Sequence, residues 1–528
     1  MSGIFGIFYR DGSPVPRSTL ETMRREMAER GPDGSDLWQE GVAGLGQARS
    51  FITPESQFER LPRMEATNGM VFTAAGRVDN RAELGSALNI PLSEEAQVPD
   101  SEFILRAYYR WGEDTPDRIY GDWAFAVWHP EERRLFVARD HHGNTALYYY
   151  SDPRLFAFAS DQKALLALNL ATMQMDELYL AQVMVSWPAY HGERTILTPI
   201  RRLPPSHCLS ITPERVNVRR YWWLEHTPEL HLPHRDDYVA AFREVFDEAV
   251  RSRLRSLDHV AVTLSGGLDS GSVTATAAGL LRQEGKRLTA FTSVPLSDTS
   301  AYVGKRFGDE LPFAQNTARK AGNLDLYTIP ATAISPLQAI RRWLEITGEP
   351  GHAAGNFFWI LDLLQTARAK GHRVLLTGQM GNGSISWDGD AFSQPLAFQL
   401  RHLGVRTWSK ERLKRSAPSA LRSLWRGRIG NRERCRSSAI HPDFALRLRL
   451  WERLGRDPNQ IGWRPPPESS AVASSCRDFP LPVRCGRIWE RLIVWRCEIL
   501  PRMPESWHSL CPCRTGSSWI RNRGWIAC

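Results

Sequence analysis

The sequence predicts two unlike halves, an α+β domain built around antiparallel sheet followed by an α/β domain with a parallel sheet. Up to about residue 225, short apolar runs separated by Gly, Asp, Asn and Pro indicate many short strands and few long helices. After residue 237, apolar runs alternate with helical patterns, which is typical of a parallel sheet covered on both faces.

The first half is assigned to residues 1–225. Two helices are expected there, over 17–28 and 101–111. Five strands are expected at 71–73, 123–128, 135–138, 146–149 and 156–159. Residues 226–236 carry two prolines and no periodicity, so they are expected to form a linker.

The second half is assigned to residues 237–470 and begins with a helix for which Asp237 is the expected N-cap. Strands are expected at 259–264, 288–294, 326–329 and 373–377, and further helices at 272–283, 313–321, 336–346 and 357–370. In an open parallel sheet, ligands bind beyond the carboxyl ends of the strands. Candidate site residues should therefore follow these strands.

The positive charge is confined to the end of the chain. The 528 residues contain 67 Lys and Arg against 58 Asp and Glu, a net charge of +9. Residues 415–528 have 21 Arg, no Lys and nine acids, so the preceding residues carry a net charge of −3. A basic body is the electrostatic signature of a nucleic-acid binder, and this body is slightly acidic. We therefore expect no nucleic-acid partner.

Cysteine usage and hydropathy indicate the compartment. Cys208 is the single cysteine before residue 415, which fits a reducing environment. No apolar run approaches the roughly 20 residues of a membrane span, and the opening residues lack the basic region of a signal peptide. A cytoplasmic protein without a membrane span is the expectation.

A phosphate-binding loop is the strongest local signal. The strand at 259–264 is followed by six residues, all small or polar except Leu268, and then a helix: Ser265, Gly266, Gly267, Leu268, Asp269 and Ser270. Backbone N–H groups in such a loop converge on an anion at the helix N-terminus. The Asp269 carboxylate can hold a Mg²⁺ that bridges phosphates. The lysine of a Walker loop is missing, and an ordinary Gly-rich turn is the alternative.

This hexamer resembles the pyrophosphate loop of the ATP-pyrophosphatase (PP-loop) enzymes, among them asparagine synthetase and β-lactam synthetase. The resemblance implies ATP and Mg²⁺ as cofactors, and a reaction in which an acyl-adenylate forms, pyrophosphate leaves and a nitrogen nucleophile displaces AMP. It further implies adenine contacts at Ser293 and Val294, and adenylate contacts at Thr377 and Gly378.

The first half resembles the class II glutamine amidotransferase domain of asparagine synthetase B. The resemblance begins at residues 2–7 and continues in order through 76–84, 100–102, 121–126, 138–143 and 159–163. It implies an Ntn-hydrolase-like sandwich followed by a PP-loop domain.

Several positions depart from the family pattern. Ser2 stands where the family has its nucleophilic cysteine, and a serine hydroxyl is much weaker than a thiol. Ala75 and Arg77 replace the asparagine and glutamate of the glutamine pocket. We expect that glutamine hydrolysis is lost; a serine-dependent amidotransferase is the alternative. In the second half, Gln379 and Asn382 replace a glutamate and a metal-binding aspartate, and Asp388 or Asp390 could substitute.

Three stretches resemble lasso-peptide macrolactam synthetases, namely 308–315, 378–389 and 438–443. This resemblance implies a precursor peptide as substrate, whose N-terminal amine attacks an adenylated Asp or Glu side chain. It also implies leader-peptide protease and recognition proteins as partners. A β-lactam synthetase, an ammonia-dependent asparagine synthetase and an inactive peptide-binding scaffold are the alternatives.

Two further acids, together with Asp269, are candidate catalytic residues. Glu310 lies in the crossover after the second strand, and Glu349 lies in a Gly-Glu-Pro turn before another helix. A surface carboxylate explains each equally well.

The tail at 471–528 is atypical, with five Trp, six Cys and no Lys. Related synthetases carry a late lysine, whereas here none follows Lys414. We interpret this segment as frameshifted or decayed, which predicts disorder or poor packing and puts the activity of the chain in doubt. A zinc site is disfavoured because no C-x-x-C pair exists.

Overall fold

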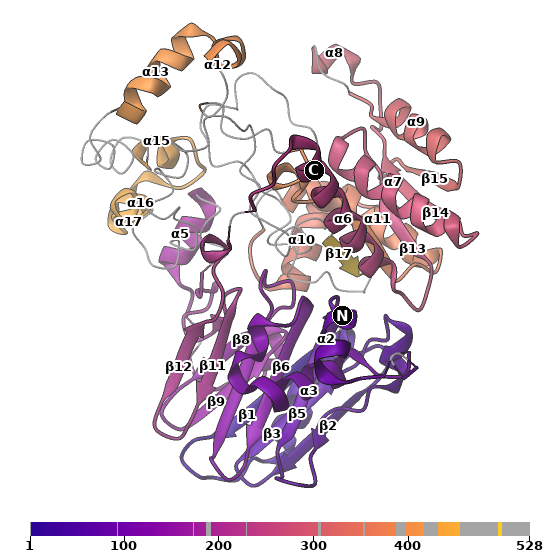
Figure 1. Ribbon diagram of the computed structural model, residues 1–528. Helices are drawn as coiled ribbons and strands as arrows, with labels where there is room; N and C mark the ends of the chain where they lie inside the picture. The colour runs from indigo at the N-terminus through magenta and orange to yellow at the C-terminus, as the bar shows by residue number, and fades with distance from the viewer. Residues whose placement is uncertain are drawn as a thin grey trace.

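The computed structural model places three sheets in two halves of the chain (Figure 1). The two six-stranded sheets belong to the first half, and the five-stranded sheet belongs to the second. The structure describes residues 2–91, 93–94, 96–172, 174–185, 192–228, 230–304, 308–351, 354–386, 392, 396–416, 431–454 and 495–498.

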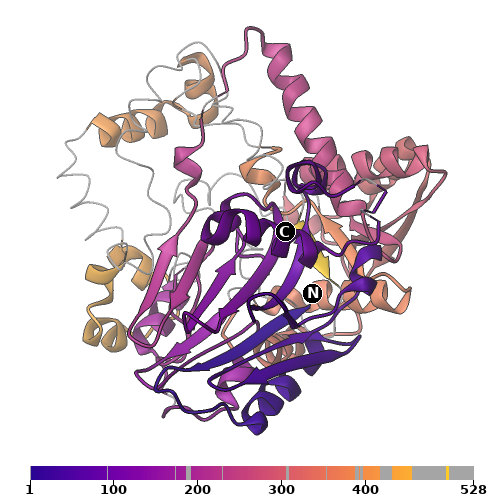
Figure 2. The same ribbon diagram turned by 60° about the horizontal axis from the view of Figure 1, so that its bottom comes forward.

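The first half is a sandwich of two antiparallel sheets. One sheet has the order β10 (Arg201–Arg202), β8 (Tyr148–Ser151), β9 (Leu155–Ala159), β1 (Gly3–Tyr9), β3 (Ala43–Ala48) and β2 (Ser35–Glu40). The other has the order β12 (Val216–Arg220), β11 (His207–Ile211), β7 (Arg134–Arg139), β6 (Gly121–His129), β5 (Val71–Val78) and β4 (Arg63–Met64). Figure 2 turns this sandwich toward the viewer.

Three apolar cores explain why the central strands are buried on both faces. Alternate side chains of β1 point to opposite sides, so that Ile4 and Phe8 pack between the sheets, whereas Phe5 and Ile7 face α1 (Arg17–Glu26) and α4 (Gln162–Leu166). The other sheet is covered by α2 (Arg81–Leu88) and α3 (Asp100–Trp111). The layers therefore run helix, sheet, sheet, helix, and the predicted α+β sandwich is confirmed.

The second half is an α/β domain. Its sheet has the order β15 (Leu324–Ile329), β14 (Leu288–Ser293), β13 (Val260–Thr263), β16 (Val374–Thr377) and β17 (Trp495–Glu498). The pairs among β15, β14, β13 and β16 are parallel, as predicted, and β17 runs antiparallel to β16.

Helices cover both faces of this sheet. One face packs on α6 (Arg235–Leu254), α7 (Leu268–Gln283) and α9 (Leu311–Ala321), and the other on α10 (Pro336–Thr347) and α11 (Phe357–Ala369). The side chains of β13 alternate accordingly, with Val260 and Val262 in one core and Ala261 in the other.

The structure corrects two local predictions. The N-cap of α6 is His234 rather than Asp237; Asp237 is the third helical residue, and its Oδ2 accepts the His234 N–H at 3.1 Å. This reciprocal arrangement is a capping box, which moves the helix start three residues upstream. In addition, α7 begins at Leu268 and not at residue 272. Asp269 and Ser270 are therefore in its first turn.

Three short helices near the C-terminal end contact the first half, which the sequence did not predict. The helices are α15 (Asn431–Arg436), α16 (Pro442–Arg447) and α17 (Leu450–Arg453), and they share an apolar cluster with α5 (Glu177–Val185). Figure 1 shows them beside α5, apart from the parallel sheet.

Most of the tail at 471–528 lies outside the described residues. Of the five residues considered for a zinc site, Cys497 is described, and Cys485, His508, Cys511 and Cys513 are not. The hypothesised frameshift of the tail stays a prediction, although four of its residues form β17. Among the described residues, no helix has the length and apolarity needed to cross a membrane.

Candidate functional site

The Ser265–Ser270 loop closes on itself at the N-terminus of α7. The Ser270 hydroxyl accepts the Ser265 N–H at 3.1 Å and lies 2.8 Å from the Ser265 hydroxyl, which in turn accepts the Gly267 N–H at 3.1 Å. Leu268 points outward and is 75 % exposed. A rigid turn at the positive end of a 16-residue helix suits an anion.

Two glycines bring the segment after β16 directly against this loop. A β-carbon at Gly378 would stand 2.3 Å from the Ser270 nitrogen, and one at Gly381 would stand 2.3 Å from Asp269 Cγ. Both distances are shorter than any real carbon contact, so glycine is needed at both positions. The structure therefore brings together the two segments that the resemblance pairs, with Thr377 at the end of β16 just before them.

Asp269 has the environment of a cation ligand. Its Oδ1 is buried and has no hydrogen-bond partner among the described residues. Burial raises the pKa of Asp269 above its ordinary value, although hydrogen bonding from Ser386 acts in the opposite direction. A bound Mg²⁺ would satisfy this oxygen and supply charge neutralisation to phosphates, so the residues present fit the implied metal.

The surroundings of Asp269 contain one of the substituted positions. The Asn382 side-chain oxygen accepts a hydrogen bond from the Ser386 hydroxyl at 3.3 Å. Asn382 thus reaches Asp269 through Ser386 and presents an amide in place of a second carboxylate. Asp388 and Asp390, the suggested substitutes, lie outside the described residues.

Glu310 lies at the loop, as the sequence suggested. It immediately precedes α9, and its Oε2 accepts the Gly266 N–H at 3.0 Å. The carboxylate occupies a donor that a phosphate oxygen would use. Phe313, one turn later, packs 3.2 Å from the position of a Gly266 β-carbon and holds α9 against the loop.

Glu349 has a different location. It is completely buried, and its Oε2 accepts hydrogen bonds from the Tyr179 hydroxyl and from Arg202 Nη2, both at 2.9 Å. Both donors belong to the first half of the chain. The sequence proposed a catalytic acid at this position, and the structure brings Glu349 together with an arginine and a tyrosine rather than with the loop.

Ser293 and Val294 lie at the carboxyl end of β14, beside β13. The Val294 N–H donates to the Ile329 carbonyl at 3.0 Å. Because this bond uses the amide hydrogen, a backbone hydrogen bond between Val294 and adenine would have to use the Val294 carbonyl oxygen as acceptor. The Thr292 hydroxyl donates to the Leu264 carbonyl at 2.7 Å and ties the end of β14 to the loop.

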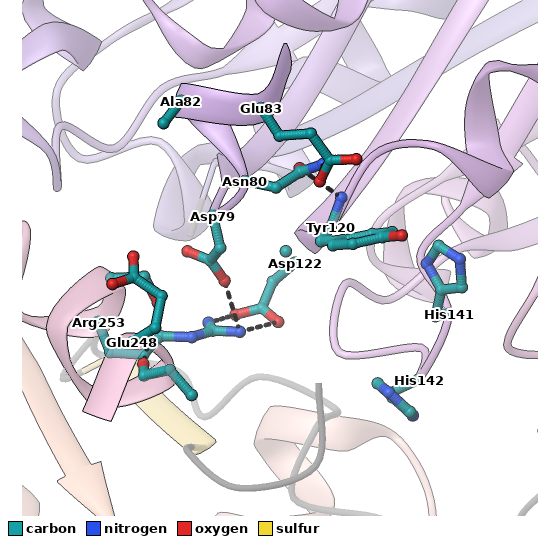
Figure 3. Close-up of a pocket in the computed structure, with 13 residues that line it drawn as sticks. Asp79, Asn80, Ala82, Glu83, Tyr120, Asp122, His141, His142, Glu248 and Arg253 are labelled. Atoms are coloured by element: carbon teal, nitrogen blue, oxygen red, sulfur yellow. Dashed lines mark hydrogen bonds and ion pairs between the residues drawn. The ribbon is translucent and has the colours of Figure 1, made fainter. Parts of the chain in front are cut away.

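A concave region between the two halves of the chain was not predicted. It is a cavity of about 270 Å³ lined from α6 and from the loops around Asp79, Tyr120 and His141. Figure 3 shows Arg253 of α6 directed at Asp79 and Asp122. Arg253 pairs with both carboxylates, at 2.9 Å in the case of Asp79. No local pattern in the sequence predicts this contact, because the partners are more than 130 residues apart.

At two of the substituted positions of the first half, Ser2 and Arg77, the side chains form hydrogen bonds within the protein. Ser2 Oγ accepts the Ser50 N–H at 2.9 Å and donates to the Ser50 carbonyl at 3.3 Å. Arg77 is 1 % exposed; its Nε bonds Asp79 Oδ1 at 2.8 Å, and its Nη2 donates to the Ser252 carbonyl of α6. Arg77 therefore links the halves from a position where the resemblance implies a pocket acid.

Comparison with known proteins matches both halves in this order. A glutamine amidotransferase domain model matches residues 1–222, and an asparagine synthase model matches residues 241–461. The first half is thus similar to glutamine amidotransferase domains and the second half to asparagine synthases. Among the curated proteins that resemble it, asparagine synthetase [glutamine-hydrolyzing] 3 of Bacillus subtilis is 31 % identical over 57 % of this chain and 49 % of its own length.

Two fungal relatives cover more of the chain. Amidase chry2 of Gibberella zeae is 26 % identical over 71 % of this chain and 57 % of its own length, and amidase chyE of Penicillium rubens is 27 % identical over 70 % and 55 %. The chain spans about half the length of the curated relatives it matches.

Proposed function

We propose that this chain is an ATP-dependent amide ligase that activates a carboxylate as its adenylate. A carboxylate oxygen would attack the α-phosphorus of ATP, and pyrophosphate would leave. An amine nitrogen would then attack the acyl carbon, AMP would leave with the original oxygen, and the amine would lose a proton. The observation that carries this proposal is the contact of Gly378 and Gly381 with the Ser265–Ser270 loop around the buried oxygen of Asp269.

The roles of the loop residues follow from their geometry. The loop N–H groups and the start of α7 would bind the departing pyrophosphate. Asp269 would hold Mg²⁺. Glu310 would have to release the Gly266 N–H when a phosphate arrives. Thr377, whose Oγ1 is buried and has no hydrogen-bond partner among the described residues, could donate to the adenylate.

The amine is proposed to come from somewhere other than the first half. An amidotransferase delivers ammonia from glutamine, which needs a strong nucleophile and a pocket for the substrate. Here the nucleophile position is Ser2, bonded to Ser50, and Arg77 occupies the pocket region with its side chain committed to Asp79 and Ser252. These contacts support a chain that has lost glutamine hydrolysis.

The finer proposal is macrolactam formation on a lasso precursor peptide. Its N-terminal amine would attack an adenylated Asp or Glu side chain of the same peptide, and a leader-peptide protease and a recognition protein would deliver it. Supporting this, the stretch at 308–315, which resembles the lasso enzymes, contains Glu310 at the loop. The Bacillus subtilis relative makes asparagine synthesis the alternative.

Pyrophosphate exchange into ATP tests both levels of the proposal. The probes are a linear peptide with N-terminal glycine and an acid eight residues on, and L-aspartate with ammonia. Exchange that requires the peptide supports the macrolactam synthetase, exchange that requires aspartate supports asparagine synthesis, and no exchange with either leaves a peptide-binding scaffold. Asp269→Asn should abolish exchange. Gly279→Ala is the matched control, because Gly279 lies in the same helix with open space around it.

A further inference from the structure

The buried acid Glu349 joins the two halves of the chain. Its carboxylate is fully excluded from solvent and accepts hydrogen bonds from Arg202 of β10 and Tyr179 of α5. Arg202 and Tyr179 are themselves buried. Burial is the largest single influence and acts to lower the pKa of Arg202, but the charges and hydrogen bonds of Glu349 and Tyr179 together raise that pKa above its ordinary value, so that Arg202 stays protonated. A charged pair held in this way fixes the turn that carries Glu349 to the first half.

The end of α10 just before this turn is held by the same domain. Gln162 Nε2 donates to the Thr347 carbonyl at 2.6 Å, and Lys163 Nζ donates to the Glu345 carbonyl. These are carbonyls of the last helical turn, which have no partner within a helix. Gly348 follows with φ of 70°, and a β-carbon there would stand 2.5 Å from Gln162 Nε2. One short helix of the first half, α4, therefore caps α10 and contacts the turn that follows it.

An apolar cluster connects this turn to the nucleotide loop. Trp343 of α10 and Phe357 of α11 lie on either side of the turn with ring centroids 4.3 Å apart. Met380 packs against the same cluster. Met380 precedes Gly381, which touches Asp269, and its own φ is 63°, a strained value for a side chain other than glycine. The cluster therefore holds Met380 in the conformation that brings Gly381 to the loop.

We propose that Glu349 is a positioning residue for the adenylation site, through which the first half of the chain holds the 377–381 segment against Asp269. The path runs from Arg202 and Tyr179 to Glu349, through the Trp343–Phe357 cluster to Met380. This inference rests on the proposed function of the loop. It gives the amidotransferase-like half a role that needs no glutamine chemistry.

Two measurements on Glu349→Gln test the proposal. Glutamine keeps an oxygen acceptor for Tyr179 but removes the charge that pairs with Arg202. In amide hydrogen exchange, peptides covering 377–383 should exchange at least fivefold faster, while those covering β14 stay within twofold of wild type. In pyrophosphate exchange, kcat should fall at least tenfold with the KM for ATP within twofold, because the Ser265–Ser270 loop is untouched.

Further variants separate positioning from general loss of stability. Arg202→Met should reproduce the effect, and Arg202→Lys, which keeps the charge, should give a smaller one. Glu177→Gln is the matched control, since Glu177 lies on α5 with Tyr179 and pairs with Arg447 at 2.8 and 2.9 Å on the exposed surface. It should leave the 377–383 peptides unchanged.

The outcomes are distinct. The proposal is overturned if the hydrogen-exchange rate at 377–383 is unchanged in both Glu349→Gln and Arg202→Met. It is also overturned if the exchange rate rises equally in all peptides of the α/β half. If the wild-type chain catalyses no pyrophosphate exchange with any probe, the proposed function fails, and the hydrogen-exchange comparison still decides whether Glu349 positions the segment.

Discussion

Gly381 and Asp269 are in contact so close that the glycine has no room for a side chain: a β-carbon at Gly381 would stand 2.3 Å from Asp269 Cγ. The two residues come from different strand–helix connections and are more than 100 positions apart. Their contact brings the carboxylate and the segment after β16 into one site.

Gly381→Ala should therefore impair activity more than it impairs folding. The new methyl group must displace Asp269 or the 377–383 segment, and overpacking of this kind costs about 1–3 kcal/mol of stability. A displacement of about 1 Å at a reacting centre costs on the order of 100-fold in rate. Pyrophosphate exchange and denaturant unfolding of the same variant measure the two effects. Gly279→Ala should keep full activity and gain about 0.5–1 kcal/mol; equal activity of the two variants contradicts the prediction.

The buried acid Glu59 should make stability fall as pH rises. Burial, the largest cause, raises the pKa of Glu59 from its ordinary 4.5 to about 7. The folded chain keeps this proton at pH values where the unfolded chain has released it, so stability is lost between about pH 4.5 and 7. A pKa difference of this size between the folded and unfolded chain corresponds to a loss of roughly 3 kcal/mol in the free energy of unfolding.

Glu59→Gln should remove that loss, since glutamine cannot ionise and can still accept the hydrogen bond from Gln47. We expect the variant to match wild type near pH 4.5 and to exceed it in unfolding free energy at pH 8. Urea denaturation at both values checks this. Glu40→Gln, at an exposed position, is the control. A constant difference between Glu59→Gln and wild type at the two pH values would speak against a titrating Glu59.

Removing Arg253 of α6 should lower the stability of the protein, because Arg253 pairs with carboxylates of the first half. Arg253→Met removes the cation paired with buried Asp122, which costs about 3–5 kcal/mol of stability, whereas Asp79 keeps its bond to Arg77. Arg251, two residues earlier, pairs with Glu248 on the surface, and Arg251→Met should cost less than about 1 kcal/mol. Chemical denaturation of both variants gives the comparison, and similar losses for the two would refute the ranking.

Restoring a thiol should not restore glutaminase activity. Ser2→Cys supplies the stronger nucleophile, but Arg77 remains in the pocket region and Ala75 offers no side-chain donor for an oxyanion. We expect no glutamate release from glutamine in a coupled assay. The triple variant Ser2→Cys, Ala75→Asn, Arg77→Glu is the informative comparison. Release by Ser2→Cys alone would show that the pocket still binds glutamine.

The elements near the loop could be predicted because their signals are local. These elements, namely β13, the glycines after it and the helix that follows, are adjacent in the sequence. The main difference is that the helix begins at Leu268 and not at the predicted residue 272. The sandwich followed similarly from short runs with turn residues between them.

Contacts between distant segments could not be predicted. Glu349 was equally consistent with a site acid or a surface acid, and its partner Arg202 lies 147 positions away. No periodicity or spacing encodes such a pair. Arg77 was recognisable as a departure, but its bond to Ser252 of α6 required the fold. The start of α6 was missed for a different reason, because a histidine N-cap is an uncommon choice.

The capping of α10 by Gln162 and Lys163 has a practical consequence for anyone who dissects this protein. Expressed separately, the α/β half would present the last carbonyls of α10 and the carboxylate of Glu349 to water, and the strained turn at Met380 would lose its support. Such a fragment could fold and still be inert. If such a fragment showed no activity, the cause would be the loss of its contacts with the first half, and the result would say nothing about the chemistry of the intact chain.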